Sequence, residues 1–129
     1  AIAGVGLGLD LTLRERQSQL KKLGHPWEIA KAFDGSCPLS PFVPFAVIAN
    51  IEDCQLQLEI DGELRQQGSS AQMLTPVLAL IAYISQHFSL LPGDVVLTGT
   101  PPGVGVLEPG MKLKLGLDQL LSLETSVCA

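Results

Sequence analysis

The sequence predicts a β-rich α+β domain in which two short helices accompany several short strands. Apolar residues alternate with polar residues or glycines at Val5–Leu11 and at Met111–Leu117, and this period of two is typical of strands. Helix signals occur in two segments, residues 12–23 and 75–88. Strands and helices do not alternate regularly along the chain, which argues against a doubly wound parallel sheet.

Length and composition indicate one folded domain over residues 1–129. Apolar residues make up 47% of the chain and charged residues 16%, which is too apolar and too weakly charged for a disordered protein. The net charge is -5 and the sequence has no basic stripe, so nucleic acid is not an expected partner. The sequence contains no run of eighteen apolar residues, which is about the length needed to span a bilayer. We therefore expect a soluble protein without a membrane partner.

The cysteines and the first residue add two further expectations. Three cysteines, Cys37, Cys54 and Cys128, have no metal-type spacing, and an odd number of thiols suits a reducing cytoplasm. The chain begins with Ala1 rather than Met. We therefore expect a cytoplasmic protein whose sequence is a processed or truncated product.

The first half of the chain predicts a strand, a helix and a long loop. The strand Val5–Leu11 carries Asp10 at its end. Thr12-Leu13-Arg14-Glu15 has the pattern of a capping box, which would start a helix that runs to Leu23 and stops at a left-handed Gly24. Four prolines between His25 and Pro44 exclude helix interiors and central strands from that stretch.

The second half predicts a hairpin, a second helix and further strands. Asp61-Gly62 is typical of a type I′ turn. Thr75-Pro76 predicts a helix start with Thr75 as the N-cap, and the apolar stripe that follows would pack on the sheet. Val95–Leu97 predicts a buried strand before the glycine-rich loop Thr98–Gly105. Met111–Leu117 and the tail through Leu123 predict two more strands, and we identify no internal repeat or linker.

Three positions are candidates for chemistry, each with a structural alternative. Asp10 could bind a cation, but turns also favour aspartate. Lys31 could direct its ammonium at a carbonyl or anionic oxygen, or extend its apolar stem along the surface. The segment Thr98–Pro101 could bind a carboxylate through its N–H groups and hydroxyl, or be a simple turn. Neither histidine has zinc-type spacing, and no G-x-S-x-G elbow is present.

Five blocks of the sequence closely resemble the fumarylacetoacetate hydrolase family, in the family's order. They are Leu9–Arg14, Pro26–Asp34, Ser36–Leu39, Asp61–Gln66 and Leu90–Pro101. The similarity is strongest to the branch of small acylpyruvases and oxaloacetate-handling enzymes, and it extends from about Ala1 to Leu117.

The resemblance implies a mixed β-sandwich or barrel-like roll, commonly a homodimer or higher homo-oligomer, that binds Mg²⁺ or Mn²⁺ in a cleft. It assigns Asp10 as a metal ligand and Lys31 as a catalytic residue that faces the carbonyl or enolate oxygen of the substrate. Thr100 would hold a substrate carboxylate, and Arg14 and Gln17 would line the cleft. The implied reaction acts on a small dicarbonyl acid, either by C–C hydrolysis of an acylpyruvate or by tautomerisation or decarboxylation of oxaloacetate through an enolate.

The sequence also departs from the family pattern. Members carry a Glu-x-Glu pair of metal ligands upstream of the strand with the aspartate, and hydrolases carry a His and Glu in a lid. Neither feature is present in these residues. We therefore expect this chain to be the C-terminal portion of the catalytic domain. The alternative is a catalytically silent folding or oligomerisation module that keeps only the sheet.

Overall fold

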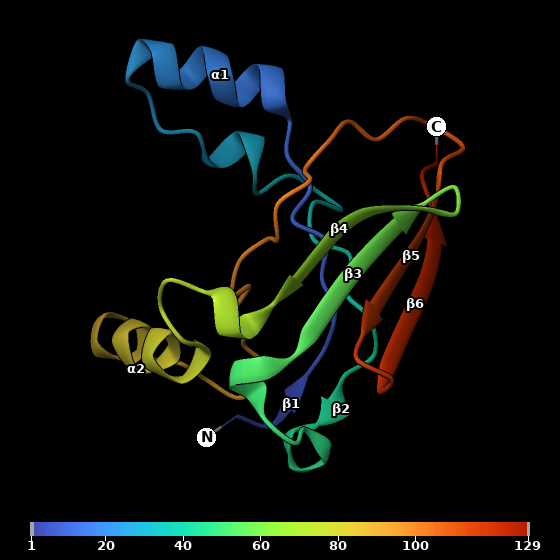
Figure 1. Ribbon diagram of the computed structural model, residues 1–129. Helices are drawn as coiled ribbons and strands as arrows, with labels where there is room; N and C mark the ends of the chain where they lie inside the picture. Colours follow the sequence, from blue (N-terminus) through green and yellow to red (C-terminus); the bar gives the residue numbers. More distant parts are fainter. Residues whose placement is uncertain (1, 129) are drawn as a thin grey trace.

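The computed structural model describes residues 2–128, which form an open four-stranded sheet, a two-stranded sheet and two helices (Figure 1). The strands are β1 (Gly4–Val5), β2 (Val43–Pro44), β3 (Gln55–Ile60), β4 (Glu63–Ser69), β5 (Lys112–Leu117) and β6 (Leu121–Ser126). The α-helices are α1 (Arg14–Leu23) and α2 (Val77–His87), and short 3₁₀ turns lie at Glu28–Ala30, Phe45–Val47, Ile51–Asp53 and Ser70–Gln72. The larger sheet is antiparallel, in the order β4-β3-β5-β6. The predicted α+β class is confirmed, and neither sheet closes into a barrel within residues 2–128.

The hairpin of β3 and β4 turns at Asp61-Gly62, as the sequence predicts. Both residues have positive φ, 52° and 83°, which a type I′ turn requires. The register shifts farther along the hairpin, because Leu58 pairs with Gln66 and Glu59 pairs with Leu64. Arg65 is thus the extra residue of a β-bulge on β4, a feature that bends a strand locally.

Two hairpins with the same pattern meet at the centre of the sheet. The first strand of each alternates polar residues or glycine with Leu or Ile and is followed by Asp, at residues 55–61 and 112–118. Asp61 exchanges two hydrogen bonds with Lys112: its N–H donates to the carbonyl, and its Oδ1 accepts from the N–H, both at 2.9 Å. Asp118 makes the same pair of bonds with Gln55, at 2.9 and 2.8 Å. The two hairpins therefore share a short local pattern.

The hydrophobic core lies on one face of this sheet. Leu58 pairs with Leu115 and Ile60 pairs with Leu113 across β3 and β5, so their side chains share a face. Leu117 extends this row, and Leu7 and Cys54 pack against it. Burial of one such aliphatic side chain contributes about 1.5–3 kcal/mol, so this row holds the two hairpins together.

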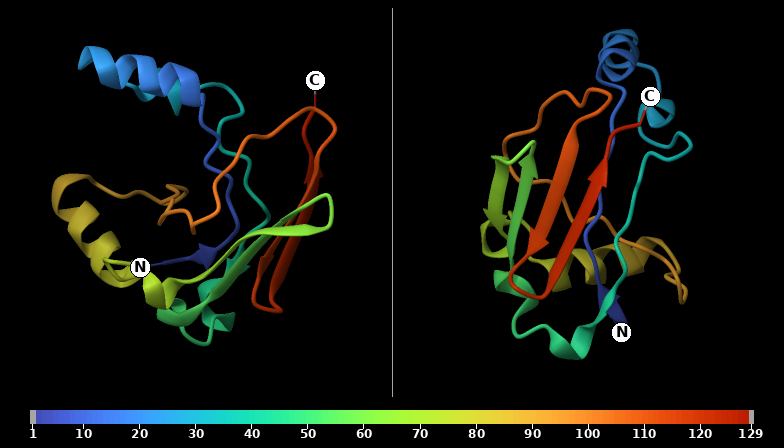
Figure 2. Two further views of the ribbon diagram at one scale, coloured as in Figure 1. Left: turned by 45° about the horizontal axis from the view of Figure 1, so that its top comes forward. Right: turned by 90° about the vertical axis from the view of Figure 1, so that its right-hand side faces the viewer.

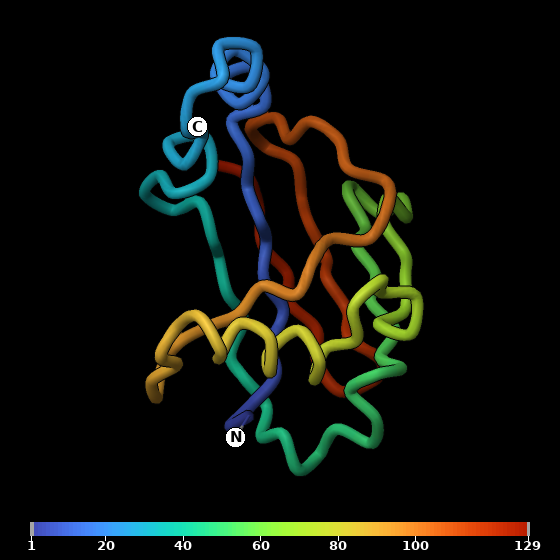
Figure 3. The backbone as a smooth tube through the Cα atoms, turned by 90° about the vertical axis from the view of Figure 1, so that its left-hand side faces the viewer, coloured from blue at the N-terminus to red at the C-terminus, as the bar shows by residue number. Residues whose placement is uncertain are grey.

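The N-terminal segment crosses the same face of the sheet as the loop around Thr98–Gly105 (Figures 2 and 3). The predicted strand Val5–Leu11 is shorter than expected, because β1 covers two residues and an isolated bridge joins Gly8 to Leu39. The Ser40 hydroxyl accepts the Leu7 N–H at 2.9 Å. A side-chain oxygen here replaces a carbonyl of the neighbouring segment, which interrupts the regular ladder.

The helix α1 stops where the sequence predicts. Gly24 adopts φ 66° in the left-handed region, and its N–H donates to carbonyls of the last turn. Glycine adopts this conformation without the Cβ clash of other residues. The left-handed stop at Gly24 is therefore confirmed.

The helix α2 begins differently from the prediction. Its N-cap residue is Pro76, and the Glu52 carboxylate accepts hydrogen bonds from the N–H groups of Val77 and Leu78, both at 3.1 Å. A carboxylate that is distant in the sequence thus accepts the first N–H groups of the helix, in place of the Thr75 side chain. The main contact of this helix with another regular element is with the turn Ile51–Asp53 and not with a strand of the sheet, and Val77 is its one buried residue.

The predicted buried strand Val95–Leu97 is also wrong. No strand is assigned between α2 and β5, and Val95 and Leu97 are each 45% exposed. Leu97 instead contacts the N-terminal segment, since a Cβ at Gly8 would lie 3.0 Å from its Cδ2. Within residues 2–128, no helix has the length and apolar character needed to cross a membrane.

Candidate active site around Asp10 and Lys31

Backbone hydrogen bonds on both sides hold Asp10 in place. The N–H of Leu9 donates to the Pro38 carbonyl at 3.0 Å, and the N–H of Leu11 donates to the Ser36 carbonyl at 2.9 Å. Asp10 lies between these two bonds on an extended segment. The carboxylate is therefore carried by a backbone that is fixed immediately before and after it.

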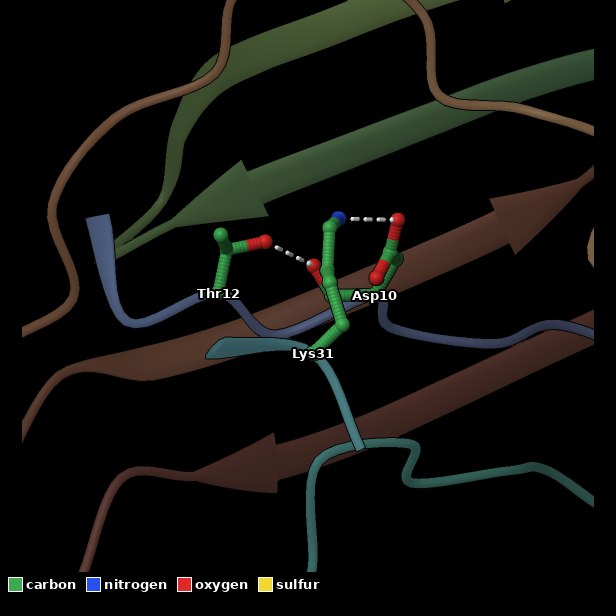
Figure 4. Close-up of polar contacts among 3 residues, drawn as sticks. All are labelled: Asp10, Thr12 and Lys31. Carbon is green, nitrogen blue, oxygen red and sulfur yellow. Dashed lines mark hydrogen bonds and ion pairs between the residues drawn. The ribbon is translucent and has the colours of Figure 1, made fainter. Parts of the chain in front are cut away.

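Lys31 reaches Asp10 from the 3₁₀ turn Glu28–Ala30. The N–H of Leu13 donates to the carbonyl of Ala30 at 3.0 Å, and Ala30 is completely buried. The turn is thus fastened to the start of α1, and the Lys31 Nζ lies 2.7 Å from the Asp10 Oδ2 (Figure 4). The structure brings together two candidate residues that lie 21 positions apart.

The contact between Asp10 and Lys31 is partly open to solvent. The two side chains are 39% and 29% exposed, respectively. An ion pair this exposed contributes about 0–1 kcal/mol to stability. The contact therefore matters less for stability than for position, because it brings a carboxylate and an ammonium group side by side.

The predicted capping box at Thr12 is not formed. The α1 N-cap is Leu13, without a side-chain hydrogen bond, and the Thr12 hydroxyl donates to the Asp10 carbonyl at 3.2 Å (Figure 4). Thr12 therefore stabilises the bend between the Asp10 segment and the helix, because its hydroxyl bonds the preceding Asp10 carbonyl rather than an N–H group of the helix.

An open hollow of about 2280 Å³ lies over the core face of the sheet. Asp10, Arg14 and Thr100 line this hollow. Gln17 lies in α1 with 7% of its surface exposed, and it is not a lining residue. Lys31 does not line the hollow either, but its ammonium contacts Asp10 at the margin. Asp10, Arg14 and Thr100 thus border the same open hollow, and the Lys31 ammonium contacts Asp10.

The structure also reveals a neighbour of Thr100 that sequence reasoning missed. The Gln66 side-chain amide on β4 donates to the carbonyl of Pro101 at 2.7 Å, and Gln66 lines the same hollow. A contact between residues 35 positions apart leaves no local signal in the sequence. The one indication is that Gln66 is a polar residue on a strand face with buried leucines, where its side chain needs a hydrogen-bond partner.

Asp10 is the candidate ligand for a hard cation at this site. Within residues 2–128, no three His, Cys, Asp or Glu side chains form a group that could hold a metal ion. Mg²⁺ prefers about six oxygen ligands in an octahedron. Asp10 has the chemistry of one such ligand, and no group of three such side chains forms around it within the described residues.

Comparison with known proteins identifies the family. The family model described as fumarylacetoacetate (FAA) hydrolase C-terminal matches residues 1–128. The chain belongs to the fumarylacetoacetate hydrolase family. The resemblance in the five sequence blocks is thereby confirmed.

Similar members of the fumarylacetoacetate hydrolase family include an enzyme of known activity. The oxaloacetate tautomerase YcgM of Escherichia coli (strain K12) is 54% identical over 119 residues, which cover 92% of this chain and 54% of that protein. The human mitochondrial oxaloacetate tautomerase FAHD1 is 40% identical over 126 residues, which cover 98% of this chain and 57% of that protein. The chain spans about half the length of the curated relatives it matches.

Solved structures of family members share the fold. A fumarylacetoacetate hydrolase family protein from Yersinia pestis has a TM-score of 0.94 and 52% identity, covering 98% of this chain and 58% of that chain. A fumarylpyruvate hydrolase from Pseudomonas aeruginosa, in complex with Mn²⁺ and pyruvate, has a TM-score of 0.91 and 39% identity. The match covers 97% of this chain and 54% of that one.

Proposed function

We propose that the protein containing this chain is a metal-dependent enzyme that acts on small dicarbonyl acids, with oxaloacetate tautomerisation as its reaction. The contact of 2.7 Å between Lys31 Nζ and Asp10 Oδ2 carries this proposal. The identity to oxaloacetate tautomerases supports this reaction over acylpyruvate hydrolysis or decarboxylation.

Tautomerisation moves one proton from carbon to oxygen through an enolate, and the chain offers residues suited to stabilising that enolate. Removal of a proton from the carbon between the two carbonyl groups leaves an enolate, and protonation of its oxygen gives the enol. The Lys31 ammonium supplies a positive charge where the enolate oxygen develops. Thr100 and the N–H groups of its loop bind a substrate carboxylate, and Arg14 adds a cation at the edge of the hollow.

Asp10 serves in this proposal as one ligand of Mg²⁺ or Mn²⁺. Water, substrate oxygens and carboxylates outside the described residues would complete the octahedron around such a cation. A bound divalent cation supplies Lewis-acid chemistry that favours the enolate. The Mn²⁺ in the fumarylpyruvate hydrolase structure supports a divalent cation of this kind.

The test compares keto–enol interconversion of oxaloacetate by the full-length protein, with Mg²⁺, and by its Asp10→Ala variant. We expect the variant to lose at least about 100-fold in rate, the size of effect seen when one key electrostatic group is removed. Glu63→Ala on the exposed hairpin is the matched control and should retain the parent rate. Equal rates for Asp10→Ala and the parent would refute the proposed site.

A catalytically silent module is the second candidate, and the lack of a group of three metal-ligating side chains within residues 2–128 favours it for the 129-residue chain. Calorimetry of this chain with Mg²⁺ or Mn²⁺, with and without oxalate as an enolate mimic, distinguishes the two. Binding that depends on Asp10 supports a functional site within the chain. Absence of binding would confine catalysis to a longer protein and leave this chain as a folded core.

We also propose a cytoplasmic homodimer or higher homo-oligomer. Large apolar side chains are exposed on α2 and in the segment after it, including Leu78, Tyr83, Phe88, Val104 and Val106. Apolar surface of this extent favours association. Sedimentation should show self-association, and a stable monomer would contradict this part of the proposal.

A further inference from the structure

The loop that carries Thr100 is fastened to the outer strand β4 by a side-chain hydrogen bond. The Gln66 Nε2 donates to the Pro101 carbonyl at 2.7 Å in a partly buried position. Pro101 directly follows Thr100, so this bond fixes the peptide next to the proposed carboxylate-binding residue. Thr98, Gly99 and Thr100 are themselves exposed, and no regular structure orders them.

Two close backbone approaches accompany this bond. A Cβ at Gly68 would lie 3.1 Å from the Cβ of Pro101, so the absence of a side chain at Gly68 lets the loop lie close to β4. Gly103 has φ 100°, and a Cβ there would collide with the Arg65 carbonyl. Arg65 is the bulge residue of β4, and the bulge turns its carbonyl toward the loop. The loop therefore rests on β4 at both Pro101 and Gly103.

The pairing of β4 with β3 shows which face Gln66 occupies. Gln66 lies opposite the buried Leu58, so its side chain is on the core face, where the loop crosses the sheet. Gln67 lies opposite Gln57, and both of these side chains are exposed on the other face. Two adjacent glutamines thus differ in orientation but not in chemistry.

We propose that Gln66 is a positioning residue for substrate binding, because it holds the Thr100 loop in the geometry that receives the substrate carboxylate. This inference rests on the role of Thr100 in the proposed function. A loop fixed in advance loses less conformational entropy when ligand binds. Without the Gln66 bond the loop samples other conformations, and the carboxylate binds more weakly.

The experiment uses the full-length protein with Mg²⁺ and compares Gln66→Met, Gln67→Met and Thr100→Val. Methionine keeps the length of glutamine and removes its N–H donor. We expect Gln66→Met to raise the KM for oxaloacetate about 5- to 10-fold, as befits the loss of one hydrogen bond, and to change kcat by less than about twofold. Gln67→Met should leave both constants unchanged.

Hydrogen exchange provides a readout that does not depend on activity. In the ligand-free protein, backbone amides of residues 98–105 should exchange faster in Gln66→Met than in Gln67→Met, whereas the thermal midpoints should agree. A purely structural role would lower the thermal midpoint of Gln66→Met and leave KM unchanged, which would overturn the inference.

The outcomes separate this inference from the proposed function. If Thr100→Val raises KM but Gln66→Met does not, the positioning role of Gln66 is wrong and the role of Thr100 stands. If neither variant changes KM although exchange accelerates, Thr100 does not bind the substrate. In that case the inference falls together with that part of the proposed function.

Discussion

The Lys31 ammonium lies 2.7 Å from the Asp10 carboxylate and makes Asp10 its ionic partner. The backbone fixes Asp10 on both sides, whereas the lysine stem is flexible. A substrate oxygen could therefore receive the ammonium without movement of the Asp10 segment.

Replacement of Lys31 by methionine should separate catalysis from cation binding. We expect Lys31→Met in the full-length protein to lower kcat for oxaloacetate tautomerisation by about 10²- to 10³-fold, because a positive charge near the developing oxyanion is lost. Mg²⁺ affinity measured by calorimetry should not fall, since Asp10 loses a competing cation. Lys22→Met, in the exposed last turn of α1, is the control. A parent-like kcat for Lys31→Met would contradict this role.

Glu52 should stabilise α2 from outside the helix. Glu52→Ala removes the acceptor of both the Val77 and Leu78 N–H groups and a negative charge at the positive end of the helix dipole. We expect the free energy of unfolding to fall by about 1–2 kcal/mol, measured by urea denaturation. Glu63→Ala on the exposed hairpin should change it by less than about 0.5 kcal/mol. Equal stabilities of the two variants would exclude the capping role.

Asp118 should tolerate asparagine but not valine. Its φ of 48° lies in the left-handed region, which asparagine adopts readily and β-branched residues resist. Asparagine also keeps the Oδ1 acceptor for the Gln55 N–H. We expect Asp118→Val to lower the free energy of unfolding by about 2–3 kcal/mol and Asp118→Asn by less than about 1 kcal/mol. Thermal denaturation that ranks the two variants alike would refute this explanation.

Cys54 should make stability fall at alkaline pH. Burial raises the pKa of the Cys54 thiol, and the negative charge of Asp118 raises it further. Above the thiol pKa of the unfolded chain, the folded state therefore binds more protons than the unfolded state. The stabilising contribution of the Cys54 thiol is complete below about pH 8.5. It is lost as the pH rises toward the pKa of the thiol in the folded protein, where the free energy of unfolding falls by at most about 1.4 kcal/mol per pH unit.

The measurement is urea denaturation of the parent and of Cys54→Ala across the alkaline range. The variant should be less stable at neutral pH, because a buried side chain is shortened, but it should lose stability less steeply as pH rises. Cys37→Ala is the control, since Cys37 is exposed. Parallel pH curves for the parent and Cys54→Ala would contradict the prediction.

Features that require a positive φ angle at one or two residues are ones that the sequence predicts well. The turn at Asp61-Gly62 and the helix stop at Gly24 depend on the φ angles of one or two residues, and both are confirmed. The cap of α2 depends on Glu52, which lies 25 residues before the helix. Local patterns favour Thr75 there, because nothing local shows that a carboxylate from another turn occupies the helix end.

The candidate site likewise has a part that the sequence identifies and a part that only the folded structure shows. The resemblance to the family identifies Asp10 and Lys31, and the structure shows the contact between them. The docking of the Thr100 loop on Gln66 depends on the bulge at Arg65 and on contacts across the sheet. These arise only when β4 and the loop are folded together, so no periodicity along the chain reveals them.

The paired aspartates at the ends of β3 and β5 have a consequence for the order of folding. Asp61 belongs to the first hairpin but bonds the start of β5, and Asp118 belongs to the second but bonds the start of β3. Each hairpin therefore gains two hydrogen bonds at its turn only when the other hairpin docks. We expect the two hairpins to cross the folding barrier as one cooperative unit, although more than fifty residues of chain separate their first strands.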